Sequence, residues 1–117
     1  MKTISDKDKL VVIWTSGERD VALKMLFVYL NNAVRNAWWQ DITLIVWGPS
    51  AKLLADDGMV RNFMSKVMDS GVKALACKGC SDEYEISEEL EGMGISVEYV
   101  GELMTQYIKS ERHVITF

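Results

Sequence analysis

The stretch Ala76-Cys77-Lys78-Gly79-Cys80 contains the only two cysteines of the chain and joins two patterns of different type. Before it, Gly71-Val72-Lys73-Ala74-Leu75-Ala76 is an apolar run opened by a glycine, too short for a helix and typical of a buried strand. After it, Ser81 and Asp82 are good helix caps, and more acidic residues follow, as in a first helical turn. We therefore predict that Cys77 lies at the carboxyl end of a strand, beside the start of a helix.

A thiol in that position has a chemical consequence. It meets unpaired backbone N–H groups and the positive end of a helix dipole, both of which stabilise a thiolate. Lys78 adds a positive charge, and a lowered pKa is what separates reactive from inert cysteines. The acidic residues from Asp82 to Glu85 act in the opposite direction. Ser87 is a competing helix start, and a helix that began only there would weaken the effect of the dipole on Cys77.

The composition describes one folded domain, which we expect to span residues 1–117. Hydrophobic residues make up 49% of the chain and there is a single proline, so a packed core is expected and disorder is not. The net charge is −4 and the 13 basic residues form no cluster, which argues against binding to nucleic acid or to anionic membranes. The longest apolar runs, 10–14 and 25–30, are too short for a signal peptide or a membrane span, so we expect a cytoplasmic protein.

Five short apolar or alternating runs have the pattern of strands, and helical patterns separate them. The expected strands are 10–14, 42–47, 71–76, 95–100 and 113–117. Strict alternation with short connections predicts the α/β class, a three-layer α/β/α sandwich with a five-stranded, mostly parallel sheet and right-handed crossovers.

The helix expected over 19–36 has a clear apolar stripe at three- and four-residue spacing. Its members are Ala22, Met25, Leu26, Tyr29, Leu30 and Ala33. Val28 falls in the opposite, polar stripe and Phe27 flanks it. Either another subunit covers part of this outer face, or these are ordinary scattered exposed apolar residues.

In a parallel sheet the loops that follow the strands share one edge, where ligands bind in this architecture. Besides the cysteine loop, this edge would contain Thr15-Ser16-Gly17, Gly48-Pro49-Ser50 and Gly101-Glu102. The first two loops, together with Gly79, could offer N–H groups to an anion at a helix start. They also read as plain turns and caps, and the chain has no dinucleotide or Walker motif.

The spacing of the two cysteines allows several chemistries. Without an export signal, redox or metal chemistry is favoured over a structural disulfide. A closed zinc site would need two further ligands, and only His113 and carboxylates remain, so we expect no metal. A thioredoxin-type exchanger usually places a cis-proline opposite its cysteines, whereas Pro49, the single proline, lies in what reads as an ordinary turn into a helix. In the plainest reading, Cys77 is a small buried apolar residue and Cys80 is incidental.

Four segments together resemble the DsrE/DsrF-like (YchN-like) sulfur-relay family: 12–17, 44–54, 76–80 and 94–101. The resemblance extends over almost the whole chain, from Lys9 to Phe117. It implies a three-layer domain that assembles into homotrimers or homohexamers. It also implies that a cysteine in the third strand-to-helix loop carries sulfur as a persulfide between proteins, and Cys77 occupies the matching position.

These observations lead to one main hypothesis, a sulfurtransferase-type carrier without a cofactor. Cys77 would accept sulfane sulfur from a donor protein and pass it to an acceptor. Lys78 would favour the thiolate, and Cys80 would either release sulfide by forming a disulfide or be a mere neighbour. The alternatives are an oligomeric protein whose edge loops bind an anion or nucleotide, and a dithiol–disulfide oxidoreductase.

Overall fold

The computed structural model of the protein describes residues 6–117. Strands and helices alternate along the chain. The elements are η1 (Asp6–Asp8), β1 (Lys9–Trp14), α1 (Arg19–Val21), the π-helical η2 (Ala22–Leu26), α2 (Phe27–Arg35), β2 (Asp41–Val46), α3 (Pro49–Asp56), α4 (Gly58–Asp69), β3 (Lys73–Cys77), α5 (Lys78–Glu83), α6 (Ser87–Gly92), β4 (Ser96–Glu98), α7 (Gly101–Lys109) and β5 (His113–Thr116).

The five strands form one sheet in the order β4-β3-β2-β1-β5. Every neighbouring pair is parallel, so the predicted mostly parallel sheet is confirmed and is parallel throughout. The third strand is displaced slightly from the expected 71–76 run, because it begins at Lys73 and includes Cys77. Each of the other expected strands overlaps an observed one.

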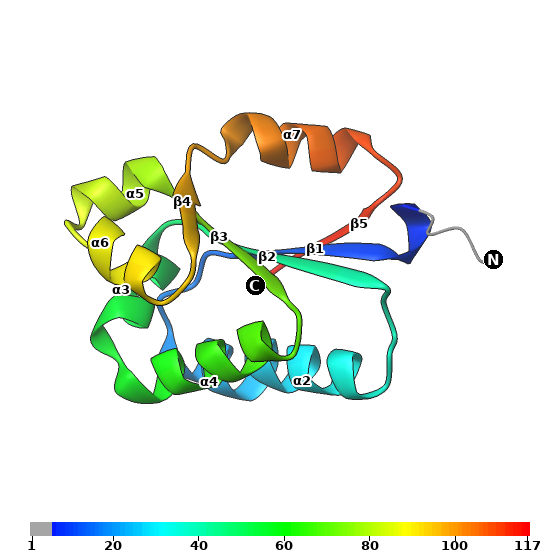
Figure 1. Ribbon diagram of the computed structural model, residues 1–117, viewed down its shortest axis with the longest axis horizontal. Coiled ribbons are helices and arrows are strands. Elements are labelled where there is room, and N and C mark those ends of the chain that lie inside the picture. The colour runs from blue at the N-terminus through cyan, green and yellow to red at the C-terminus, as the bar shows by residue number, and fades with distance from the viewer. Residues whose placement is uncertain (1–5) are drawn as a thin grey trace.

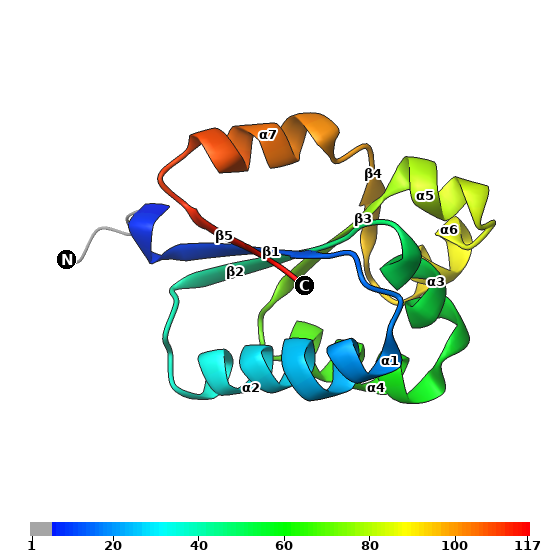
Figure 2. The same ribbon diagram turned by 180° about the vertical axis from the view of Figure 1, so that it is seen from behind.

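The helices cover the two faces of the sheet unequally. From β1 to β4 each new strand is added on the same side of the previous one, and right-handed crossovers in a constant direction leave their helices on one face. The chain then turns back past β1 to form β5, which puts α7 on the opposite face. Figures 1 and 2 show α7 alone over one face, with α2 and α4 side by side under the other.

The core accordingly has a large part and a small one. The large part lies between the sheet and the α2 and α4 helices, where the ring of Trp14 meets that of Phe27 edge-on at 5.7 Å between centroids. The small part lies under α7 and centres on Val11, Ile13 and Ile45. No residue of α7 itself is buried, so the second face of the sheet is thinly covered.

The first long helix contains a feature that the sequence pattern did not predict. Residues Ala22–Leu26 form a π turn in which the N–H of Phe27 donates to the carbonyl of Ala22. A π turn contains more residues per turn than an α-helix and therefore rotates the following residues. Phe27 is buried, at 2% exposure, while Met25 is 53% exposed, so the expected positions of these two side chains were wrong.

No helix within the described residues is long and apolar enough to cross a membrane.

Candidate functional site

Cys77 lies where the sequence predicts, at the junction between β3 and α5. It is the last residue of the strand and the N-cap of the helix, with extended backbone angles of φ −68° and ψ 119°. The α5 helix begins at Lys78, so Ser81 and Asp82 lie inside it and are not the caps that the sequence suggested, while Ser87 begins a separate helix as expected. Both helices have only six residues, which limits the dipole that Cys77 can meet.

The two thiols are free, half-buried and in contact with each other. The Cys80 thiol makes a hydrogen bond with Cys77 and accepts one from the backbone N–H of Gly48. Burial is the main cause that raises the pKa of Cys80, and the neighbouring Cys77 thiol raises it further, whereas the Gly48 N–H lowers it. The Cys80 thiol therefore loses its proton only at a higher pH than an ordinary thiol does.

Lys78 is held by a carboxylate. Its Nζ lies 2.6 Å from Asp82 Oδ2, one helical turn along α5, and 5.9 Å from the centre of the Tyr99 ring. The hydrogen bond to Asp82 raises the pKa of Lys78, while Lys78 and then Ser87 lower that of Asp82. Of the acidic residues that follow the thiol in the sequence, Asp82 therefore pairs with Lys78, whereas Glu83 helps to raise the pKa of Cys80.

The loops after β1 and β2 pack closely against each other. Pro49 approaches Gly17 so closely that a Cβ on Gly17 would lie 3.1 Å from the Pro49 Cβ. The Ser50 hydroxyl is fully buried and donates to the carbonyl of Trp14. Gly48 has a φ of +85°, which side chains rarely allow, and this conformation lets its N–H reach Cys80.

The polar groups of the loop after β1 make hydrogen bonds to other parts of the same chain. The N–H and hydroxyl of Thr15 and the N–H of Ser16 donate to the carbonyl of Phe117. The Ser16 hydroxyl accepts from the N–H of Glu18. Of the predicted anion-binding residues, Gly79 is exposed and lies next to Cys77, where a Cβ would be 4.0 Å from the sulfur.

The structure adds two residues to this edge that sequence reasoning missed. Tyr99 is 72% exposed and lies under the Lys78 ammonium just after β4. The sequence placed Tyr99 inside the expected strand 95–100, whereas β4 ends at Glu98, so its position after the strand had no sequence signal. Ser81, which the sequence suggested only as a helix cap, has its Oγ buried one residue after Cys80 without a hydrogen-bond partner among residues 6–117. In the same part of the chain, no group of three His, Cys, Asp or Glu side chains could hold a metal ion.

This fold and site define a class, the α/β proteins in which a five-stranded parallel sheet of order 4-3-2-1-5 brings a Cys-x-x-Cys pair to its carboxyl edge. A solved structure from Bacteroides thetaiotaomicron, the conserved protein of unknown function BT1422, matches over 99% of this chain and 100% of its own, with 31% identity and a TM-score of 0.94. The chain belongs to the same family as BT1422.

A second solved structure extends the likeness of the fold. The ychN protein from E. coli matches over 93% of this chain and 98% of its own, with 18% identity and a TM-score of 0.62. The fold is therefore YchN-like. No protein-family model and no curated protein matches the chain.

Proposed function

We propose that the protein is a sulfur carrier that holds sulfane sulfur as a persulfide on Cys77. The observation that carries the proposal is the position of this thiol, half-exposed at the N-cap of a helix on the carboxyl edge of a parallel sheet. The YchN-like fold and the resemblance to the DsrE/DsrF-like family support it. Both cysteines are free, as a reducing cytoplasm would keep them.

The transfer is a pair of thiol exchange steps. The Cys77 thiolate attacks the outer sulfur of a donor persulfide, R–S–SH; a new S–S bond forms on Cys77, the donor S–S bond breaks, and the donor leaves as a thiolate. An acceptor thiolate then attacks the outer sulfur of Cys77–S–SH and restores the Cys77 thiolate. Neither step needs an outside oxidant or reductant.

Cys80 offers a second route by which the persulfide on Cys77 can lose its outer sulfur, without an acceptor protein. Its sulfur already contacts Cys77, so a Cys80 thiolate could attack Cys77 Sγ, form the Cys77–Cys80 disulfide and expel hydrosulfide. The raised pKa of Cys80 keeps most of it protonated near neutral pH, which protects the persulfide from this loss. Transfer to an acceptor should therefore dominate near neutral pH and sulfide release should increase in alkali.

The test is intact mass spectrometry after incubation with a persulfide donor. The wild type should gain one sulfur atom, Cys77→Ser should gain none, and Cys80→Ser should gain one and retain it longer. A wild type that stays unmodified would overturn the proposal. So would equal loading of Cys77→Ser.

The contact between the thiols favours a second candidate, a dithiol–disulfide oxidoreductase. A partly exposed first cysteine and a partner whose pKa is raised by burial suit disulfide exchange. In that case a glutathione redox titration of the wild type should show a reversible two-electron disulfide with a defined potential, and persulfide donors should yield the disulfide without a stable added sulfur.

We also propose that the protein works as a homo-oligomer, a trimer or hexamer, and meets separate donor and acceptor proteins. The resemblance suggests the assembly. Large apolar side chains on α7, β5 and the loop before α7 support it, because Ile108 is 61% exposed and Tyr99 72%.

A further inference from the structure

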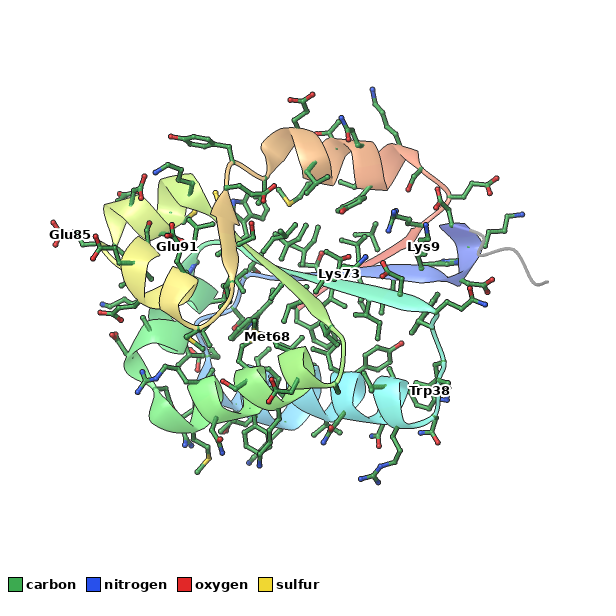
Figure 3. All side chains as sticks on the ribbon, in the orientation of Figure 1. Lys9, Trp38, Met68, Lys73, Glu85 and Glu91 are labelled. Carbon is green, nitrogen blue, oxygen red and sulfur yellow. The ribbon has the colours of Figure 1, made fainter. Side chains whose placement is uncertain are left out.

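A pocket of about 380 Å³ lies at the edge of the sheet opposite the cysteines. Its rim includes the first residues of β1, β2 and β3, which are Lys9, Asp41 and Lys73. Cys77 ends the strand that Lys73 begins, so the two sites are separated by the length of β3, roughly 13 Å. Figure 3 shows Lys9 at the end of the molecule away from Glu85 and Glu91 of the α5–α6 region.

The topology explains why the pocket exists. Successive side chains of a strand point to opposite faces of the sheet, so Asp41, Thr43 and Ile45 of β2 share one face, the face that only α7 covers. The α7 helix contributes Leu103 and Tyr107 to the pocket, and Leu75 of β3 provides an apolar wall. A single helix leaves space here that two helices fill on the other face.

Positive charge is concentrated in this pocket although the chain is acidic, with a net charge of −4. Lys9, Lys73 and Arg112 line it together with one carboxylate, Asp41. Asp6 lies beside it, 3.1 Å from Lys9 Nζ, so cations exceed carboxylates by three to two even when Asp6 is counted. The balance favours an anion.

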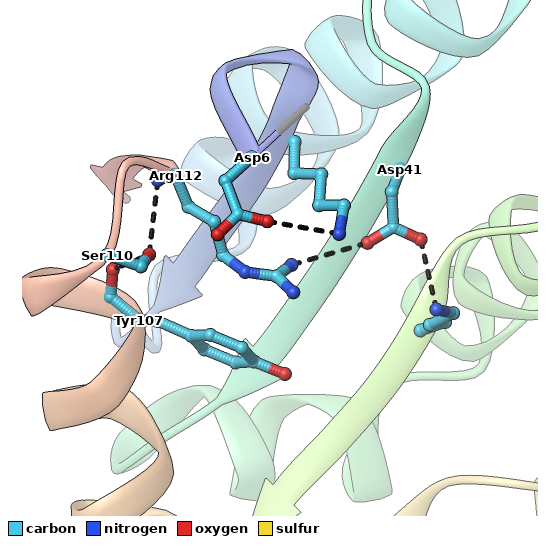
Figure 4. A network of polar contacts seen from close by, with 7 residues as sticks. Asp6, Asp41, Tyr107, Ser110 and Arg112 are labelled. Atoms are coloured by element: carbon cyan, nitrogen blue, oxygen red, sulfur yellow. Dashed lines mark hydrogen bonds and ion pairs between the residues drawn. The ribbon is translucent and has the colours of Figure 1, made fainter. Parts of the chain in front are cut away.

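Arg112 is the best placed of the three cations. Its guanidinium stacks on the Tyr107 ring at 4.7 Å from the centroid and is 19% exposed. Figure 4 shows it between that ring and Asp41. The contact to Asp41 Oδ2 is 3.6 Å, too long for a hydrogen bond, while Lys73 Nζ lies 3.0 Å from Oδ1 of the same carboxylate. A guanidinium has five donors in a planar fork that fits a carboxylate, so Arg112 keeps donors for a ligand.

We propose that this pocket is a binding site for a small organic carboxylate with a flat apolar body. Arg112 and Lys9 bind the carboxylate, and Leu75, Leu103 and the Tyr107 ring enclose the apolar part. The site is separate from the proposed sulfur chemistry and does not depend on it.

Isothermal titration calorimetry with benzoate tests the proposal, with benzyl alcohol as a probe of the same shape without charge. Benzoate should bind saturably, benzyl alcohol at least about tenfold more weakly, and Arg112→Gln should weaken benzoate about tenfold. Lys52→Gln, which removes an exposed cation outside the pocket on α3, should bind benzoate like the wild type. Amide shifts in an NMR titration should centre on Thr43, Leu75 and Arg112.

Three results would overturn the proposal: no saturable benzoate binding, equal binding of benzyl alcohol, or inorganic phosphate binding more tightly than benzoate. If Arg112→Gln fails to fold, Lys9→Gln gives the same comparison, because its ammonium also lines the pocket. Sulfur loading of Cys77 should be unchanged in either variant, so failure here and failure of the sulfur carrier are distinguishable.

Discussion

At the scale of single residues, Cys80 offers a direct test of the environment of the cysteine pair. Burial is the largest cause of its raised pKa, and the Cys77 thiol adds to it. Removing Cys77 should leave the burial and the Gly48 N–H but take away the second cause, so the pKa of Cys80 should fall in Cys77→Ala. The pH dependence of iodoacetamide alkylation, followed by peptide mass spectrometry, should show Cys80 reacting at lower pH in the variant.

The control for that experiment is the wild type alkylated only briefly, in which Cys80 should remain largely unmodified near neutral pH. A Cys80 that reacts equally fast in both proteins would contradict the contact between the two sulfurs.

How far the sequence predicts this site can be judged residue by residue. The apolar run before Cys77 was enough to place the thiol at a strand end, because short buried strands leave a clear signal. The partner of Lys78 was not predictable, since the same acidic residues could have acted on the thiol or on the lysine. The approach of Gly48 to Cys80 brings the loop after β2 to the first turn of α5, about thirty residues further along the chain, and no local sequence pattern predicts it.

At the scale of elements, the π turn in the first long helix decides which side chains are buried. Phe27 packs on Trp14 and stacks with Phe63 at 6.0 Å, whereas its neighbour Val28 is 49% exposed. Phe27→Ala should lower the free energy of unfolding by about 3–5 kcal/mol, because it leaves a core cavity. Val28→Ala should change it by less than about 0.5 kcal/mol.

Urea unfolding of both variants provides the measurement. A large loss for Val28→Ala would mean that another subunit covers this face, the reading that the sequence left open. The sequence could not decide between the readings, because a regular α-helical repeat places Phe27 beside the polar stripe and contains no indication of the added residue per turn.

The N-cap of α4 leads to a pH-dependent prediction. Asp57 accepts from the N–H groups of Met59 and Val60 and lies 2.7 Å from Arg19. The bond from Val60, followed by Arg19, lowers the pKa of Asp57 below its ordinary value of 3.8. A carboxyl whose pKa is lowered in the folded state contributes stability that is complete above that ordinary value and disappears as the pH falls through the lower, folded one.

Asp57→Ala should therefore lower the melting temperature at neutral pH by roughly 4 °C, the effect of losing one cap. Asp57→Asn is the matched control, because asparagine caps a helix equally well but does not titrate. The wild type should melt above Asp57→Asn at neutral pH, and calorimetry at decreasing pH should show the difference shrinking below pH 3.8 and vanishing once the pH is below the lowered pKa of the folded state. A difference that stays constant with pH would exclude Asp57 as its source.

At the scale of the whole molecule, strand order determines what the two faces and two edges can do. Alternation of strands and helices predicts a parallel sheet, but it does not say where the fifth strand joins. Because β5 pairs with β1, a single helix crosses the second face, and that face has both the polar pocket and a helix without buried residues. The pocket residues come from three strands, the α7 helix and two loops, so no local sequence pattern indicated them.

The same asymmetry supports the last prediction, that the α7 side is where copies of the chain associate. β5 is an edge strand with one neighbour, and its Val114 and Ile115 are 37% and 39% exposed, while Ile108 of α7 is 61% exposed. An apolar edge of this kind is normally covered. Sedimentation velocity should give a trimer or hexamer for the wild type. Ile108→Glu should shift it towards the monomer, because association would bury the new charge. Gln106→Glu, exposed on α7 but on a different side of the helix from Ile108, should leave the assembly intact. A monomeric wild type at high concentration would refute the association altogether.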